Sequence, residues 1–355
     1  MTTSLAFTHL RFDCLACSPI KLGGYQAGER LRDALASVML RAVCPEMQRG
    51  EKPTPQHAAG CPACWLLAAD TDPGNVRRAY TLAPPLPQLD LVPAGGRFSF
   101  VLTLFGKAAG PQANGVALQG GGWQYLPYFV LAVPAMGEIG VGPGGGKFAL
   151  EAIWALDPLN GQAEAVLRPG EAVVYPPQGR VDWVAAQAAA EAWAPALVGC
   201  DLRLRFLTPT RLIEGEALVK EADFGVFFQR LLQRIDAVAQ QYTGEARRPP
   251  EEVVHLHALA DRVRLVRADT EWVDLWAPSG RTGRRTPMGG LVGTAEYRAR
   301  DWAPLLPWLI FGQGVQAGKL VVKGNGVFAV DLPAVAPHRA DHYWQRIYTR
   351  TAGVG

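Results

Sequence analysis

Residues 200–244, CDLRLRFLTPTRLIEGEALVKEADFGVFFQRLLQRIDAVAQQYTG, contain the clearest secondary-structure pattern of the chain. Polar and apolar residues alternate over 201–206, which is typical of a half-buried strand. The segment 222–244 has apolar residues at helical spacing and ends at Gly244, which favours a helix with a glycine cap. Its apolar positions are Val226, Phe227, Leu231, Ile235 and Val238. A strand followed by an amphipathic helix predicts an α+β domain.

The beginning of the chain shows the same order. LAFTHLRFDCLA (5–16) alternates loosely like a strand, GGYQAG (23–28) forms a turn, and AGERLRDALASVMLRAV (27–43) has a helical apolar face. Each half also has a glycine loop that leads into a late strand, although no residue-level repeat relates the halves. We therefore expect two α+β domains with antiparallel sheets and helices on one face. The predicted divisions are 1–197, 198–333 and a basic C-terminal tail, 334–355.

Other segments predict the remaining elements. We expect strands at 97–106, after the glycine loop in 140–157, at 260–277 (one strand or a pair) and at 319–332. We expect helices at 123–140, 183–197 and 302–312, and a loop from Pro45 to Pro62.

The composition limits the class of protein. The 355 residues carry a net charge of +3, with 49% hydrophobic and 19% charged residues, which argues against disorder. With 39 glycines and 28 prolines we expect many loops, but glycine has no collagen period. No apolar run reaches the roughly 18 residues that span a bilayer, and His9, Arg11 and Asp13 interrupt any signal peptide. We therefore expect a cytoplasmic protein with no membrane partner.

The loop GQGVQAGKLVVKGNG (312–326) has five glycines together with Lys319 and Lys323. Such a backbone can approach a phosphate closely, and its N–H groups and two ammonium groups can hold it. The spacing fails for a Walker A loop, because Gln313 replaces the first glycine and Leu320 the Ser/Thr. The alternative is a glycine-rich connection between strands.

The segment WAPSGRTGRRTPMGGLVG (276–293) adds three arginines, Arg281, Arg284 and Arg285, to this basic region. Between residues 281 and 323 seven basic residues face only two acidic ones, a balance that attracts phosphate. A solvated basic loop is the alternative.

Three cysteines and a histidine lie in one short segment. Cys61 and Cys64 form a C-x2-C pair, Cys44 precedes them, and His57 completes a set of four zinc ligands. Cys14 or Cys17, from a second C-x2-C pair, is an alternative fourth ligand. The segment either binds a structural zinc or holds buried or free thiols.

Two histidine pairs have spacings that would place both members on one face of an element. On a strand, His255 and His257 would share a face, as a base and its neighbour or as metal ligands. On a helix, His338 and His342 would share a face. The alternatives are ordinary, partly buried histidines and a solvated terminal helix.

In their order and spacing, several segments together resemble the CRISPR-associated Cas-six endoribonucleases of the RAMP superfamily. The resemblance runs from about Tyr25 to Asp331. It rests on GYQAGERLRDAL, CPACWLLA, VLTLFGKA, MGEIGVGPGGGKF, LTPTRL, ADFGVFFQRLLQRIDAVAQQYTG, WVDLWAPSGRTGRRTPMGGLVG and GKLVVKGNGVF. It implies two tandem ferredoxin-like (RRM-like) domains and cleavage of precursor CRISPR RNA without metal or cofactor. The products would be a 2′,3′-cyclic phosphate and a 5′-OH.

The resemblance also implies site residues. The RNA-binding set is Arg281, Arg284, Arg285, Gly318, Lys319, Lys323, Gly324 and Gly326. The catalytic set is Lys319, His257 and Tyr25, where Lys319 would clamp phosphate and His257 or Tyr25 would move protons. Relatives commonly have a histidine where this chain has Gln316, which exchanges no proton near neutral pH.

Three hypotheses follow. The first is a slow repeat-RNA endoribonuclease. The second is an inactive subunit that holds repeat RNA within a CRISPR effector complex, with Cas subunits as partners. The third is an unrelated α+β protein with a zinc-stapled loop.

Overall fold

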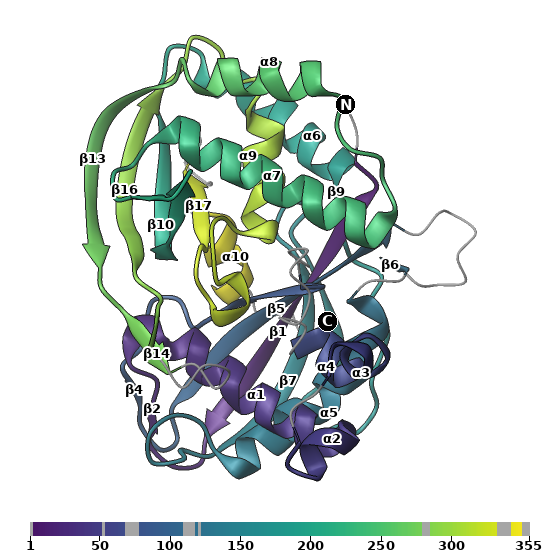
Figure 1. Cartoon of the computed structure of the whole chain (residues 1–355). Coiled ribbons are helices and arrows are strands. Elements are labelled where there is room, and N and C mark those ends of the chain that lie inside the picture. Colours follow the sequence, from purple (N-terminus) through teal and green to yellow (C-terminus); the bar gives the residue numbers. More distant parts are fainter. Residues whose placement is uncertain are drawn as a thin grey trace.

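Each half of the chain builds an antiparallel sheet covered by helices, and the two halves lie against each other (Figure 1). We refer to them as the N-terminal lobe (sheet residues up to 182) and the C-terminal lobe (sheet residues 202–331). The computed structural model describes residues 3–51, 54–67, 78–108, 118–119, 122–278, 285–331 and 342–349. None of its helices, within these ranges, combines the length and the apolar character that a membrane span requires.

The sheet of the N-terminal lobe has the strand order β3-β5-β1-β7-β8. Its strands are β1 (Leu5–Ala16), β3 (Tyr80–Ala83), β5 (Arg97–Ala108), β7 (Phe148–Asp157) and β8 (Gln162–Leu167), with β6 (Leu118–Gln119) beside β5 and β9 (Val181–Asp182) beside β1. Helices α1 (Ala27–Val43) and α5 (Leu126–Ile139) pack on one face. The chain order β1-α1-β3-β5-α5-β7, with β1 between β5 and β7, is ferredoxin-like.

The sheet of the C-terminal lobe repeats this topology. Its strand order is β13-β16-β10-β17. The strands are β10 (Leu202–Thr210), β13 (Arg264–Val273), β16 (Gly290–Arg298) and β17 (Phe328–Asp331), and the helices are α7 (Phe224–Thr243), α8 (Pro250–Ala260) and α9 (Leu306–Val315). Helix α7 begins where Asp223 Oδ1 accepts a hydrogen bond from Val226 N at 2.9 Å. It ends at Gly244, whose φ of 73° suits glycine. The prediction of two α+β units with antiparallel sheets is therefore confirmed.

Shorter elements complete the two lobes. The two-stranded ribbons are β2 (Ile20–Lys21) with β4 (Leu91–Val92), β11 (Leu212–Glu214) with β12 (Ala217–Val219), and β14 (Trp276–Pro278) with β15 (Arg285–Pro287). The 3-10 helices are η1 (Gly24–Gln26), η2 (Trp123–Tyr125), η3 (Ala194–Leu197) and η4 (Val321–Lys323). The remaining α-helices are α2 (Pro45–Gln48), α3 (Pro55–Gly60), α4 (Pro62–Leu67), α6 (Trp183–Trp193) and α10 (Tyr343–Thr349).

Three predicted elements differ from the structure. The expected loop 45–62 contains α2 and α3, because Cys44 and Thr54 cap their N-termini and proline occupies the first turn. The expected strand at 319–332 is confined to β17, since η4 interrupts it. His255 and His257 lie on helix α8 and not on a strand. Two residues apart on a helix, they point in different directions and do not share a face.

Helix α6 connects the lobes and packs on the helices of the C-terminal lobe. The rings of Trp183 and Trp308 lie 3.9 Å apart between their centroids. Trp183, Ala186, Ala190 and Trp193 join the same hydrophobic core as α7 and α9. Leu5 and Phe7 of β1 also enter this core, so the lobes share apolar packing. The predicted domain boundary after residue 197 stays a prediction.

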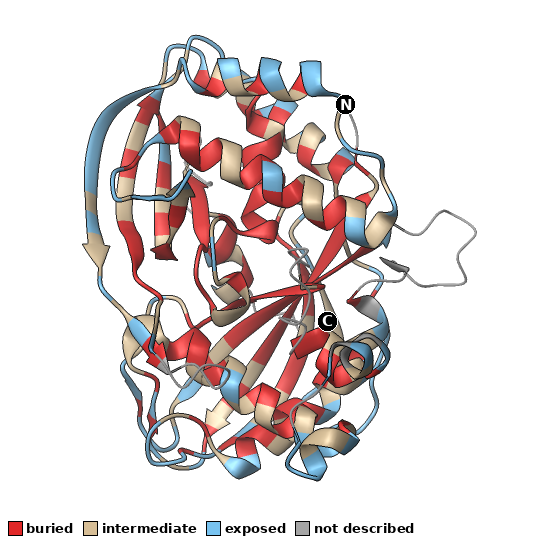
Figure 2. Cartoon of the chain, in the orientation of Figure 1, coloured by how far each residue is buried: buried red, intermediate tan, exposed pale blue. Residues whose placement is uncertain are grey.

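Strand β1 is buried on both faces, as Figure 2 shows along most of its length. Leu10 and Phe12 point into the core beneath α1 and α5. On the opposite face, His9 and Arg11 are also buried, with exposed fractions of 0% and 4%. A strand covered on both sides explains why its sequence alternates only loosely.

Helix α10 covers this second face of β1. Tyr343, Trp344 and Ile347 are buried between Val101 of β5 and Ala329 of β17. The Arg11 guanidinium donates a 2.7 Å hydrogen bond to the Ile347 carbonyl, and Trp344 Nε1 donates to the Phe328 carbonyl at 2.9 Å. The alternative of a solvated terminal helix is therefore wrong, because α10 joins the two lobes.

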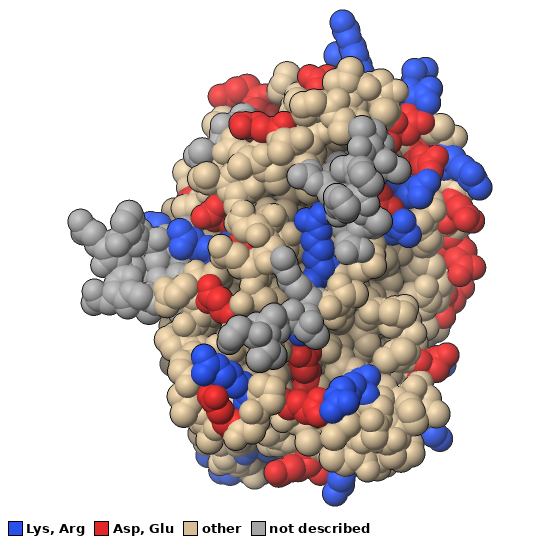
Figure 3. Space-filling model, turned by 180° about the vertical axis from the view of Figure 1, so that it is seen from behind, with Lys and Arg blue, Asp and Glu red and all other residues tan. Residues whose placement is uncertain are grey.

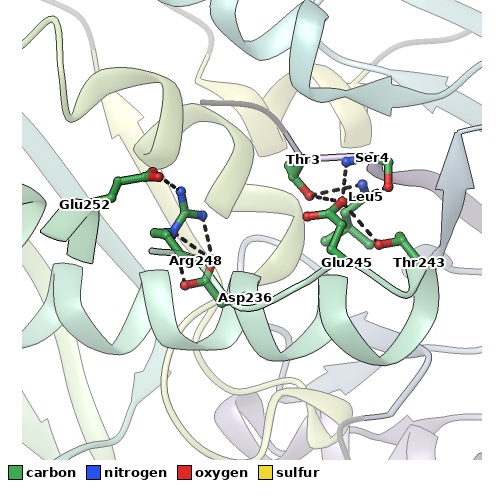
Figure 4. A network of polar contacts seen from close by, with 8 residues as sticks. All are labelled: Thr3, Ser4, Leu5, Asp236, Thr243, Glu245, Arg248 and Glu252. Atoms are coloured by element: carbon green, nitrogen blue, oxygen red, sulfur yellow. Dashed lines mark hydrogen bonds and ion pairs between the residues drawn. The ribbon is translucent and has the colours of Figure 1, made fainter. Parts of the chain in front are cut away.

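A polar network ties the first described residues to the segment after α7 (Figure 4). Glu245 accepts hydrogen bonds from Thr3 Oγ1 at 2.8 Å and from Ser4 Oγ at 2.7 Å. Arg248 forms ion pairs with Asp236 and Glu252, and its guanidinium lies over the Trp308 ring, 4.1 Å from the centroid. These groups satisfy one another, so the network stabilises the loop between α7 and α8.

Candidate functional site

The glycine loop 312–326 packs inside the molecule for much of its length. Residues 312–315 form the last turn of α9. Gln316 and Asn325 are 0% exposed. A Cβ on Gly326, whose φ is 75°, would lie 1.8 Å from the Ala317 carbonyl oxygen, so only glycine fits there. The predicted phosphate-binding backbone is therefore largely occupied by contacts within the protein.

Gln316 lies at the position where the family resemblance implies a histidine. Its φ is 63°, and its Nε2 donates a 3.1 Å hydrogen bond to the Leu82 carbonyl of β3. Its Oε1 is buried and has no hydrogen-bond partner among the described residues. The side chain therefore bridges the two lobes, away from solvent.

The two lysines of the loop have different environments. Lys319 is exposed, and its backbone N–H donates to the Arg211 carbonyl at 3.1 Å. Lys323 Nζ lies 3.2 Å from Glu29 Oε1 of α1, and both side chains are mostly buried. Burial raises the pKa of Glu29, and the Lys323 charge opposes that rise. Of the two, Lys319 is the more exposed to solvent.

The described charges of the predicted basic region have different surroundings. Arg281 and Arg284 lie outside the described residues, and Arg285 is exposed on β15. Arg298 pairs with Asp201 at 2.6 Å. On the face opposite that of Figure 1, basic and acidic side chains are interspersed (Figure 3).

A second group of basic residues surrounds the aromatic ring of Trp272 on β13. The Arg211 guanidinium lies 5.9 Å and Lys220 Nζ 5.5 Å from the ring centroid. Arg211 is also the residue whose carbonyl binds the Lys319 backbone. Sequence reasoning missed this group, because its members come from three segments; the signal was a tryptophan within a polar strand.

Tyr25 and His342 line a cleft of about 490 Å³ between the lobes. Tyr25 belongs to η1, just before α1, and His342 directly precedes α10. Arg205 of β10 also lines the cleft, where it is paired with Asp331 at 2.5 Å. The structure thus places the predicted Tyr25 in the same cleft as His342.

The cleft offers proton donors. Burial, with a smaller contribution from the negative charge of Glu271, raises the pKa of Tyr25, so its phenol stays protonated at neutral pH. His342 Nδ1 accepts a hydrogen bond from Gln345 N at 3.2 Å. This bond leaves the proton of the neutral ring on Nε2.

The structure does not bring His257 to this cleft. Helix α8 lies at the outer end of the C-terminal lobe, whereas η1 and α1 belong to the other lobe (Figure 1). His257 Nε2 is buried and has no hydrogen-bond partner among the described residues. Lys319 does not line the cleft either, although η4, next to it, packs on the first turn of α1.

The predicted ligands of the cysteine segment do converge. Atoms of Cys44, His57, Cys61 and Cys64 all lie within 4.8 Å of one another. The other C-x2-C pair is not part of this group, since Cys14 is buried in β1 and Cys17 is exposed.

Comparisons with known proteins agree with this architecture. A family model described as an N-terminal domain matches residues 5–179. The model of the CRISPR-associated endoribonuclease Cas6 matches residues 204–328. A search of curated proteins found no match.

Solved structures share the fold at low identity. Thermus thermophilus Cas6 is 15% identical, with a TM-score of 0.52, and the match covers 92% of this chain and 99% of that one. A Cas6 product complex is 16% identical, with a TM-score of 0.51 and coverage of 91% and 98%. A chain of a partial Cas6-RT-Cas1–Cas2 complex is 14% identical, with a TM-score of 0.56 and coverage of 95% and 49%. Residues 204–328 therefore match the family of the CRISPR-associated endoribonuclease Cas6 in sequence, and the chain shares the fold of two ferredoxin-like lobes with the Cas6 structures.

Proposed function

We propose that this protein binds CRISPR repeat RNA and cuts precursor CRISPR RNA within the repeat. The observation that carries the proposal is the Cas6 match over residues 204–328. The cleft between the lobes, which holds Tyr25 and His342, supports the position of the reaction. The likeness to a Cas6 chain within a Cas6-RT-Cas1–Cas2 complex supports other Cas proteins as partners.

The proposed reaction needs no metal. The ribose 2′-OH gives up its proton to a base or to water while its oxygen attacks the adjacent phosphorus, the bond from phosphorus to the 5′-oxygen breaks, and that 5′-oxygen receives a proton. The products are a 2′,3′-cyclic phosphate and a 5′-OH. The reaction requires a proton donor for the leaving oxygen and positive charge for the phosphorane.

The cleft can supply the donor. Tyr25, held protonated by its surroundings, is our candidate for protonating the leaving 5′-oxygen. His342 provides a second N–H at the same cleft. Lys319, exposed on the neighbouring loop, is the candidate phosphate contact. His257 takes no part in the proposed reaction, because α8 contributes no residue to the cleft.

RNA outside the cleft would follow the basic and aromatic group of Arg211, Lys220 and Trp272. An aromatic ring can stack on a base, and flanking cations can bind the backbone. Arg285, exposed on β15, extends the basic surface.

A second candidate function is retention of repeat RNA without cleavage. The observation that favours it is Gln316, a buried amide at the position where relatives commonly have histidine. Such a subunit would hold the RNA within an effector complex.

A single-turnover assay on the cognate repeat RNA separates the two functions. It is run in EDTA, beside an RNA with 2′-deoxy at the cut site. Cleavage that the 2′-deoxy group abolishes confirms the metal-free reaction. Tight binding without cleavage supports the holding function, and no RNA binding at moderate salt overturns both.

A further inference from the structure

The segment after α1 places three thiols and an imidazole in one buried cluster. Cys44 ends α1, His57 lies in α3, Cys61 joins α3 to α4, and Cys64 lies in α4. Cys44 Sγ lies 3.3 Å from His57 Nε2 and 3.4 Å from Cys64 Sγ. The three cysteines are at most 7% exposed.

These spacings fit a tetrahedral zinc ion. Bonds of roughly 2.3 Å to sulfur and 2.0 Å to nitrogen place neighbouring ligand atoms about 3.5–3.8 Å apart. The ligand atoms of the cluster lie within 4.8 Å of one another, so a small contraction suffices to close the shell. A set of three cysteines and one histidine leaves no open position, which is the mark of a structural site.

The surroundings of His57 fix which nitrogen faces the thiols. Its Nδ1 lies 3.4 Å from Glu46 Oε1, and the other carboxylate oxygen of Glu46 accepts a hydrogen bond from Thr54 N at 3.0 Å. Zinc-binding histidines usually donate their second N–H to a carboxylate in this way. The contact between Glu46 and His57 therefore orients His57 Nε2 toward the three thiols.

The short helices of this segment would gain stability from a bound structural zinc. Helices α2, α3 and α4 have 4, 6 and 6 residues, too short to be stable in isolation. Yet α4 positions Trp65, whose ring lies 4.9 Å from that of Tyr125 and 6.0 Å from that of Tyr242 on α7. The segment thus reaches from the N-terminal lobe to a helix of the C-terminal lobe.

We propose that Cys44, His57, Cys61 and Cys64 bind one structural zinc ion through three sulfur atoms and His57 Nε2. The ion holds α2, α3 and α4 together and keeps Trp65 in place between the lobes. The site is independent of the RNA reaction and makes no demand on the proposed function.

The first test is the metal content of the full chain, expressed in zinc-supplemented medium and purified without chelator. We expect about one zinc per chain by mass spectrometry. Cys61→Ser should lose most of it, whereas Cys200→Ser, which changes a cysteine outside the cluster, should keep it. Zinc-free wild-type protein, or equal zinc in both variants, overturns the proposal.

A second test does not depend on how well a variant folds. Wild-type protein is exchanged from zinc to cobalt, and its absorption spectrum is recorded. Intense tetrahedral d–d bands with thiolate-to-cobalt charge transfer in the wild-type protein support the site. The weak spectrum of six-coordinate cobalt bound by oxygen overturns it. Neither readout involves RNA cleavage.

Discussion

Lys323 Nζ lies 3.2 Å from Glu29 Oε1, and this ion pair joins the glycine loop of one lobe to the first turn of α1 in the other. The side chains are 17% and 8% exposed, so solvent screens the pair only weakly. Lys319, four residues earlier, is exposed. Two lysines that look equivalent in the sequence therefore have different tasks.

Alanine at each lysine should separate these tasks. Lys319→Ala should weaken binding of repeat RNA and lower the salt slope of log K by about one, with unchanged stability. Lys323→Ala should lower the free energy of unfolding by roughly 3 kcal/mol, because Glu29 remains buried without its partner. Filter binding over a salt series and urea denaturation measure the two effects.

The double variant Glu29→Gln/Lys323→Met is the control, since it removes both charges. It should recover much of the stability lost in Lys323→Ala. A salt slope changed by Lys323→Ala but not by Lys319→Ala would reverse the assignment.

Gly28→Ala should destabilise the contact between the lobes. A Cβ at this position would lie 2.3 Å from the Lys323 carbonyl oxygen and 2.7 Å from Gly324 Cα. Both neighbours are backbone, so we expect a loss of about 1–3 kcal/mol by thermal or urea denaturation. Gly60→Ala is the control, because nothing lies within 4 Å of its added Cβ. Equal stability of the two variants would contradict the packing.

His9 should make the protein sensitive to acid. Burial lowers its pKa to about 3, whereas its pKa in an unfolded chain is about 6.5. At a pH between 3 and 6.5, His9 is protonated in the unfolded chain but neutral in the folded protein. The free energy of unfolding is therefore unaffected above pH 6.5 and falls as the pH decreases below it. The loss reaches about 2 kcal/mol at pH 5.

His9→Gln keeps hydrogen-bonding atoms near Thr103 and Tyr343 but does not titrate. Its stability should fall less steeply than that of the wild type between pH 7 and pH 5. Urea denaturation at each pH gives the comparison, and parallel profiles would rule out His9 as the cause.

Tyr25→Phe should slow cleavage by about 10²-fold or more while RNA affinity is retained, if the phenol protonates the leaving oxygen. Because the pKa of Tyr25 is raised, wild-type activity should not decline through its deprotonation between pH 7 and pH 9. Single-turnover rates measure both effects. Tyr175→Phe, which changes an exposed tyrosine, is the control.

His342→Ala should also slow cleavage, and His257→Ala should not, because His342 lines the cleft with Tyr25 and His257 does not. His255→Ala, an exposed position on α8, is the control. If His257→Ala alone abolished cleavage, the reaction would have to lie on the α8 side of the molecule.

The elements with regular periodicity could be predicted from the sequence. The apolar stripe of 222–244 and the alternation of 201–206 depend on local contacts with one core, so helix α7 and strand β10 follow directly from their residues. The cysteine spacing likewise named four residues that converge. These four residues are close in the sequence, so the short segments between them keep their side chains close in space.

Tertiary structure decided what lies between the lobes. Nothing in LAFTHLRFDCLA shows that His9 and Arg11 are buried, because the helix that covers them begins at Tyr343, more than 300 residues later. A similarly long separation in the sequence conceals that Tyr25 and His342 line one cleft and that Glu29 pairs with Lys323. Periodicity records only that a face is apolar, and a polar face that a distant segment covers leaves no local pattern.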